Sequence, residues 1–178
     1  MKNIKQVLVL TLCAVFVGGV AWSMQVADGA GKKKKDPALE RTRKTVKMLD
    51  DIYKTAVVLI TTHYVNDEDD LPAGTAAIAL FDAISKKGWH DVRLLDASGE
   101  PLKDKNVAKD DFEKAAVKQL KAGKPWYEEI VEKDKKRYLR AATPIPVVLK
   151  KCIMCHENYE DFKGSEPIGA LSYKILIE

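Results

Sequence analysis

Two cysteines and a histidine near the end of the chain have the types and spacing for a specific chemistry. Cys152 and Cys155 are separated by two residues and His156 follows at once, which gives the pattern C-x-x-C-H. Two thiols at this spacing can form thioether bonds with the two vinyl groups of one porphyrin. The adjacent imidazole then lies beneath the iron and can bind it as the proximal ligand. The motif therefore predicts one covalently attached haem c.

Three other uses of this cysteine pair fit the sequence less well. A disulfide across two intervening residues would close a loop too short to stabilise the fold much. A thioredoxin-like site needs a strand before the first cysteine and a helix that opens at it, whereas a proline-stiffened segment, residues 143–148, precedes Cys152. Zinc could take both cysteines and two of the three histidines, but the paired H-x-x-x-H spacing is missing.

The sixth iron position needs a ligand from elsewhere in the chain, and His63 is the first candidate. It is in phase with Leu49, Ile52, Ala56 and Ile60, which are spaced three or four residues apart. The pattern predicts that all five lie on one buried face of a long helix, from which His63 could approach the iron opposite His156. A structural histidine in the core or at the helix end is the alternative interpretation.

Two further residues are weaker candidates for that position. His90 alternates with Val92 and Leu94 on a predicted strand, where a histidine is more often structural. Met48 has a thioether that can bind iron, but a methionine at helical spacing more often fills a core. Cys13 lies inside the predicted export signal described next, so a thiolate ligand is not expected.

Residues 1–27 are typical of a secretory signal peptide. Lys2 and Lys5 precede an uncharged apolar run from Val7 to Trp22. The run is short for a membrane span, which needs about 20 apolar residues, so we expect cleavage and a periplasmic protein. Contact with a membrane is expected only if the segment remains uncleaved as an anchor. Residues 28–36 are interpreted as a lysine-rich linker, and residues 37–178 as the folded domain.

The overall composition is that of a globular protein. Hydrophobic residues make up 46% and charged residues 31% of the 178 residues, and the net charge is only +4. Because lysines are interspersed with acids, the charge does not favour nucleic acid as a partner. The acidic run at residues 67–70 lacks the EF-hand spacing for calcium and is interpreted as a solvated loop. No Ser-His-Asp or paired-carboxylate arrangement can be assigned, so we expect no enzyme, a haem peroxidase included.

Helix-capping residues delimit three helices that must position the motif. Asp36 and Pro37 begin the first, which should run to about residue 65. The second should end at Gly88. Asp110 and Glu113 form a capping box that begins the third. The predicted helices therefore span about residues 37–65, 72–87 and 111–121.

Segments with strand-like alternation occupy most of the remaining chain. They predict strands at about residues 89–96, 126–132, 137–142 and 168–177, the middle two joined as a hairpin. The haem motif then lies just before the last strand. Helices segregated beside such strands define an α+β protein with an antiparallel sheet flanked by helices and a long N-terminal helix.

Four segments together resemble a known family. V-R-L-L-D-A-S-G-E-P, R-Y-L-R-A-A-T-P-I-P, C-I-M-C-H and I-G-A-L-S-Y-K-I are similar to segments of periplasmic c-type haem-binding domains with a PAS-like fold. The resemblance covers about residues 37–178 and implies a PAS-like antiparallel sheet. It implies Cys152 and Cys155 as haem anchors and His156 as proximal ligand, but no fixed sixth ligand. Such domains also serve as sensor modules, and with no signalling module attached here a sensory role would need a separate signalling protein.

The sixth iron ligand decides between two expected functions. If a second side chain fills the position, electron transfer with a redox partner protein is expected. If the position is open, redox or gas sensing, with NO or CO as the gas, is the alternative. We expect electron transfer. The sequence indicates no particular oligomeric state.

Overall fold

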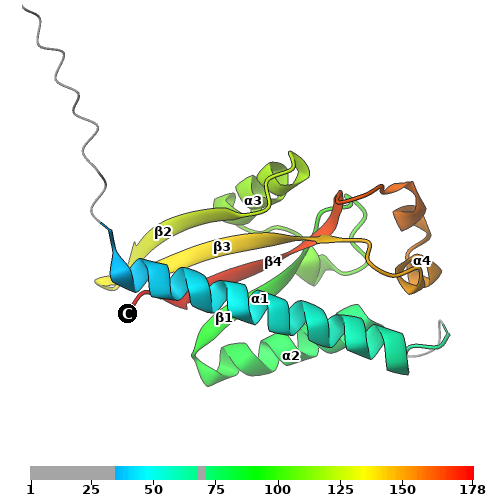
Figure 1. Cartoon of the computed structure of the whole chain (residues 1–178), viewed down its shortest axis with the longest axis horizontal. Helices are drawn as coiled ribbons and strands as arrows, with labels where there is room; N and C mark the ends of the chain where they lie inside the picture. Colours follow the sequence, from blue (N-terminus) through cyan, green and yellow to red (C-terminus); the bar gives the residue numbers. More distant parts are fainter. Residues whose placement is uncertain (1–34, 68–70) are drawn as a thin grey trace, which may run out of the picture. The chain divides into compact units, whose positions relative to one another are not determined.

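A four-stranded antiparallel sheet with the strand order β1-β4-β3-β2 lies at the centre of the fold (Figure 1). The structure is a computed structural model that describes residues 35–67 and 71–178. Its elements are α1 (Pro37–Tyr64), α2 (Ala73–Lys87), β1 (His90–Asp96), η1 (Asp104–Asn106), α3 (Asp111–Lys121), β2 (Tyr127–Lys133), β3 (Lys136–Pro146), α4 (Lys151–Cys155), η2 (Glu157–Asp161) and β4 (Pro167–Leu176). The last strand in the chain is therefore central, paired with β1 on one side and β3 on the other.

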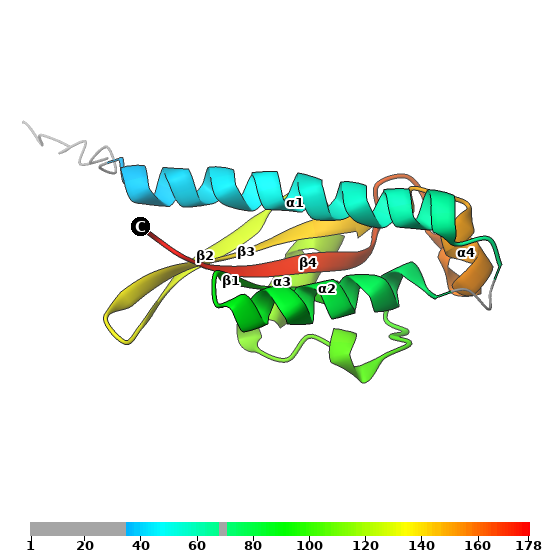
Figure 2. The ribbon, with the colours of Figure 1, turned by 90° about the horizontal axis from the view of Figure 1, so that it is seen from below.

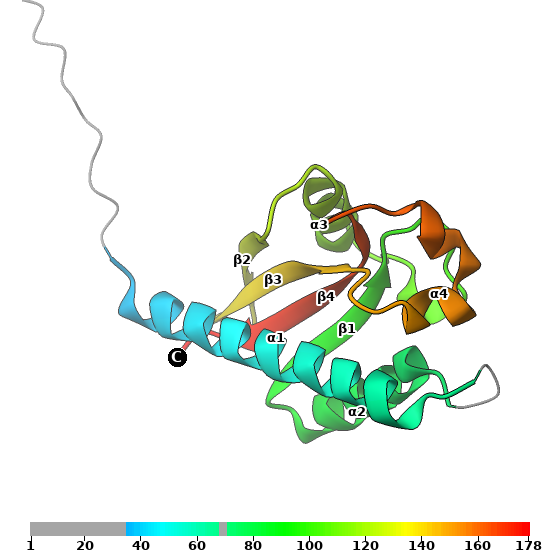
Figure 3. The same cartoon turned by 45° about the vertical axis from the view of Figure 1, so that its right-hand side comes forward.

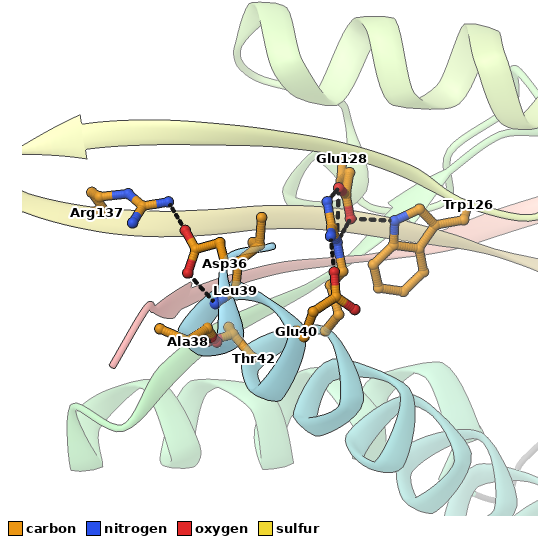
Figure 4. A network of polar contacts seen from close by, with 9 residues as sticks. Asp36, Ala38, Leu39, Glu40, Thr42, Trp126, Glu128 and Arg137 are labelled. Atoms are coloured by element: carbon orange, nitrogen blue, oxygen red, sulfur yellow. Dashed lines mark hydrogen bonds and ion pairs between the residues drawn. The ribbon is translucent and has the colours of Figure 1, made fainter. Parts of the chain in front are cut away.

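The start of α1 is set by the capping residues that the sequence contains. The Asp36 carboxylate accepts a hydrogen bond from the Leu39 backbone N–H at 3.1 Å, and Pro37 lies in the first turn. Arg137 of β3 donates to the same carboxylate at 2.6 Å (Figure 4). The residue that caps the helix therefore also fixes it to the sheet.

A second polar contact holds α1 about two turns further on. The Arg43 guanidinium Nε donates to the two carboxylate oxygens of Glu128 on β2 at 3.0 and 3.1 Å. The indole N–H of Trp126 donates to Glu128 at 2.7 Å (Figure 4). This charge-assisted arrangement satisfies both oxygens of the carboxylate, so the pair is geometrically well defined.

Helix α1 lies across β3 and β4, and α2 packs beside it along β1 (Figure 2). The two helices and the sheet face they cover enclose the larger core, within which the Tyr53 and Phe81 rings meet edge to face at 5.3 Å. The buried residues of this core are Leu39, Val46, Tyr53, Ala77, Phe81, Val92, Leu139, Ala141, Leu171, Tyr173 and Ile175. Burial of this apolar surface is the main force that holds α1 on the sheet.

The buried face of α1 differs from the predicted one. Ile52 is 53% exposed, Met48 is 55% exposed and His63 is also exposed. The buried positions include Val46 and Tyr53 instead. The prediction was wrong for Ile52 and His63, whereas Leu49, Ala56 and Ile60 are half-buried and Leu49 packs against the core. Apolar residues occupy more than one face of this helix, and tertiary packing selects which face turns inward.

The opposite face of the sheet is covered by α3. Asp110 caps this helix as predicted, with its carboxylate accepting from the Glu113 backbone N–H at 2.9 Å. Glu113 is buried, and its carboxylate accepts from Arg93 at 2.5 and 2.6 Å and from the Lys109 backbone N–H at 2.8 Å. The smaller core beneath α3 consists of Leu95, Phe112, Ala116, Leu120, Ala142 and Ala170.

Strands β2 and β3 form the predicted hairpin, whose turn residues Asp134 and Lys135 both have positive φ. Strand β3 is longer than expected and continues through Pro144 and Pro146. The pairing with β2 ends at Ala142, so both prolines lie where one side of β3 is an edge. Prolines are tolerated there because no ladder hydrogen bond is lost on the open side.

The α+β fold class predicted from the sequence, an antiparallel sheet flanked by helices with a long N-terminal helix, is confirmed, and its PAS-like character stays a prediction. The predicted signal peptide, residues 1–27, and all but the last two residues of the linker lie outside the described residues. Within the described part of the chain, no helix is both long and apolar enough to cross a membrane.

Candidate functional site

The C-x-x-C-H motif lies on a short helix in the connection between the two central strands β3 and β4 (Figure 3). Helix α4 is a single turn in which the Cys152 backbone N–H donates to the Leu149 carbonyl at 3.0 Å and the His156 N–H to the Ile153 carbonyl at 3.2 Å. Residues three apart on a helical turn lie on the same face. The local fold therefore brings Cys152 and Cys155 to one side, and both are half-buried free thiols.

His156 ends α4 and turns its ring against Tyr159. The two ring centroids are 4.3 Å apart and the ring planes are inclined by only 4°. Partial burial lowers the pKa of the His156 imidazole, against a weaker opposing effect of the Asp96 charge. Burial therefore favours the neutral imidazole, which is the form that can bind a metal ion.

Tyr159 and Asp96 are residues of this site that sequence reasoning did not identify. Burial, with smaller contributions from Asp96 and Cys152, raises the pKa of the Tyr159 hydroxyl to about 12. Asp96 ends β1, where its carboxylate accepts from the Ser98 hydroxyl at 2.6 Å and from the Gly99 backbone N–H at 2.8 Å. The H-x-x-Y spacing was a usable signal for Tyr159, whereas the place of Asp96 depends on tertiary folding alone.

The motif is joined to the C-terminal end of α1. The Lys151 ammonium donates to the carbonyls of Thr62 at 3.1 Å and Val65 at 2.5 Å. A cation at a helix C-terminus satisfies carbonyls that have no partner within the helix. Figures 1 and 2 both show α4 beside this end of α1.

The motif itself is half-buried, and some apolar side chains in the adjoining segments are exposed. No residue of α4 or η2 is buried. Tyr64, in the last turn of α1, is 76% exposed, and Val148, four residues before Cys152, is 56% exposed. A large, flat, apolar group bound at Cys152 and Cys155 would find apolar side chains to cover, so the residues present fit a porphyrin.

The three candidates for the sixth ligand occupy different places. His63 lies in the last turn of α1, beside the Thr62 carbonyl that Lys151 binds. His90 begins β1 and its Nε2 is 2.8 Å from the Tyr53 hydroxyl. It is thus six residues, or roughly 20 Å along the strand, from Asp96 near the motif. Met48 precedes Thr62 by fourteen residues, roughly 21 Å along the helix. The structure therefore brings His63, but not His90 or Met48, near the motif.

Other metal chemistry finds no support. Across residues 35–67 and 71–178, no group of three or more histidine, cysteine, aspartate or glutamate residues could hold a metal ion. The zinc alternative, which needs both cysteines and two histidines, therefore has no such group among these residues. Most of the acidic run weighed as a calcium loop, residues 68–70, lies outside the described residues.

The fold and the motif together define an α+β domain with a C-x-x-C-H helix in the connection before its last strand. The sequence model of the Tll0287-like family matches residues 32–167, and the chain belongs to this family. One similar solved structure is that of the cyanobacterial heme-protein Tll0287. It is 13% identical, with a TM-score of 0.49 over 80% of this chain and 97% of that chain. A search of curated proteins found no match.

Proposed function

We propose that this protein binds one haem covalently as haem c, through thioethers from Cys152 and Cys155, with His156 as the proximal iron ligand. The observation that carries the proposal is the short helix α4, which sets both thiols on one side and His156 at its end. Membership of the Tll0287-like family supports it, because the family takes its name from a protein described as a heme-protein.

The residues of the chain have separate roles in this proposal. The two thiols tether the porphyrin edge, and the neutral imidazole of His156 supplies a nitrogen to the iron. Tyr64 and Val148 are exposed apolar side chains in the segments that adjoin the motif, and we propose that they cover part of the ring. When bound, the haem supplies an iron that changes between the ferric and ferrous states and has one further coordination position.

We propose His63 as the residue that reaches this further position. Its side chain is exposed, and it lies one residue from the Thr62 carbonyl held by Lys151. The rotamer freedom of an exposed side chain permits it to turn toward an iron beside α4. A fully buried histidine at this point would not have that freedom.

Electron transfer is the function that this coordination would support. An iron with histidine on both sides keeps six ligands in both oxidation states, so it changes oxidation state with little rearrangement. We propose that the protein works in the periplasm, after export by residues 1–27, and exchanges electrons with a redox partner protein. Redox or gas sensing through a separate signalling protein is the second function, favoured if His63 does not bind. No catalytic role is proposed.

Intact-mass measurement tests haem attachment. Protein produced with a haem c maturation system should be heavier than the bare chain by one haem. The Cys152→Ala, Cys155→Ala double variant should have the mass of the bare chain. A wild-type mass equal to that of the bare chain, with both thiols free, would refute the proposal.

Optical spectra of the ferrous protein with CO separate the two functions. A low-spin spectrum that CO leaves unchanged is expected for electron transfer, and ready CO binding would favour sensing. In His63→Ala the spectrum should become high-spin and CO should bind. If the spin state of His63→Ala equals that of the wild type, His63 is not the ligand. His90→Ala is the matched control and should leave the spin state unchanged.

A further inference from the structure

We propose that Tyr159 fixes the plane of the His156 imidazole beneath the iron and is therefore a positioning residue for the proximal ligand. The inference rests on the proposed haem attachment. It concerns a residue that touches the ligand, not the iron, so its effect is expected on coordination geometry and not on attachment itself.

The contact between the two rings is close and nearly parallel. Their centroids are 4.3 Å apart and their planes differ by 4°. Rotation of the imidazole about its Cα–Cβ or Cβ–Cγ bonds would break this contact or drive the ring into Tyr159. Both residues are half-buried, so the tyrosine also keeps water from one face of the imidazole.

The backbone of η2 imposes this contact. The Tyr159 backbone N–H donates to the His156 carbonyl at 2.9 Å, which closes the first turn of the 3₁₀ helix. In such a helix, side chains three residues apart eclipse one another. His156 is the N-cap of η2 and not one of its helical residues, so the hydrogen bond from Tyr159 to its carbonyl is what keeps the two residues, and hence their rings, side by side.

A third ring supports the first two. Phe162 follows Tyr159 by three residues, and its backbone N–H donates to the Tyr159 carbonyl at 3.3 Å. Its ring meets the tyrosine ring edge to face, with centroids 6.1 Å apart and planes inclined by 77°. Tyr159 is thus held between the imidazole and Phe162, which limits its own movement.

Stacking takes the role that a hydrogen bond usually has in such sites. A metal-binding histidine is normally oriented by a hydrogen bond from its second ring nitrogen to a carboxylate, carbonyl or water. Among the described residues, no side chain hydrogen-bonds to the His156 ring, whose close ring contact is with Tyr159. Tyr159 is therefore the contact that defines the ring plane.

Three variants of the haem-loaded protein test this role, each checked by intact mass. Tyr159→Ala removes the ring, Tyr159→Phe retains it without the hydroxyl, and Phe162→Leu is the control that leaves the imidazole contact in place. The readouts are the electron paramagnetic resonance spectrum of the ferric protein, which reports imidazole orientation, and displacement of His156 by external imidazole.

In Tyr159→Ala the resonance lines should broaden or split, because more than one imidazole orientation is populated. The concentration of external imidazole that displaces half of the ligand should fall by roughly 2- to 10-fold, the range expected for loss of one aromatic pair. Tyr159→Phe should restore wild-type values for both readouts. Phe162→Leu keeps the ring on the imidazole but removes its support, so its change should lie between wild type and Tyr159→Ala. If Tyr159→Ala is not loaded with haem, Tyr159→Leu replaces it.

The inference would be overturned if Tyr159→Ala had wild-type resonance lines and wild-type displacement by imidazole. It would also be overturned if Tyr159→Phe behaved like Tyr159→Ala. These outcomes differ from failure of the proposed function. If haem attachment itself is wrong, the wild-type protein has the mass of the bare chain and none of these spectra exists.

Discussion

The two ends of α1 are built differently. At the N-terminal end, Asp36 and Arg43 bind Arg137 and Glu128 of the sheet, and both contacts are ion pairs between side chains (Figure 4). At the C-terminal end, the Lys151 ammonium of α4 binds two backbone carbonyls. Tyr64 and His63 beside it are exposed.

This difference indicates which end of α1 is held by protein contacts alone. The N-terminal end has partnered charges and a buried core beneath it, so it needs no further component. The C-terminal end has apolar side chains that water still reaches, and a bound porphyrin would exclude that water. We therefore expect a cofactor to stabilise one end of α1 much more than the other.

Loss of the haem should have the largest effect on this comparison. In the Cys152→Ser, Cys155→Ser variant, covalent haem is lost entirely. Amide hydrogen exchange should become faster in residues 58–66 and 150–162 and remain unchanged in residues 36–46, because only the first two segments lie beside the proposed haem site. Equal acceleration at both ends of α1 would contradict the asymmetry.

A cavity beneath the fixed half of α1 should have the next largest effect. Leu139 is fully buried in the core under α1, so Leu139→Ala should lower the free energy of unfolding by about 2–5 kcal/mol, measured by denaturant titration. Ile130 pairs with Leu139 across the hairpin but is 45% exposed. Ile130→Ala is the control and should cost less than about 1 kcal/mol.

Neutralising Glu128 should weaken the N-terminal end in a pH-dependent way. Hydrogen bonding from Arg43 lowers the pKa of the Glu128 carboxyl below its usual value of 4.5, so the folded state favours the charged form. The ion pair then stabilises the protein fully above pH 4.5, and this contribution is lost as the pH falls through the lowered pKa.

The measurement compares wild-type protein with Glu128→Gln between pH 3 and pH 7. The variant should be less stable by about 1 kcal/mol at pH 7, and the difference should shrink at the acid end. A difference that stays constant over this range would mean that the carboxylate charge does not act through Arg43.

Removal of the Lys151 charge should have the smallest effect. Lys151→Met leaves the Thr62 and Val65 carbonyls to water, which should cost about 0.5 kcal/mol in protein without haem. With haem attached, the thioethers hold α4 and the cost should be smaller still. Thermal unfolding of both forms gives the comparison. A larger loss in the haem-loaded protein would show that Lys151 acts on the cofactor directly.

Much of this fold could be predicted because capping residues in the sequence mark where its helices begin and end. Asp36 and Asp110 accept backbone hydrogen bonds at the starts of their helices, and Gly88 takes the left-handed conformation that ends α2. These are local interactions, so neighbouring residues suffice to recognise them. The orientation of α1 could not be predicted in this way, because the choice between its apolar faces depends on residues far away in the sequence.

The residues of the candidate site also differ in whether local sequence or tertiary contacts bring them together. Cys152, Cys155 and His156 are contiguous and were found from spacing alone. Asp96 approaches His156 only after β1 has paired with β4, so no sequence pattern could have identified it. The haem-binding role of these residues remains a prediction for the experiments above.

The order of the strands has a consequence for how the molecule matures. Strand β4 is made last yet lies between β1 and β3, so the two halves of the sheet cannot join until the residues that follow the cysteines are present. In every chain with a completed sheet, Cys152 and Cys155 have therefore already been synthesised. If haem is attached as proposed, both thiols are therefore available to it before β4 closes the sheet.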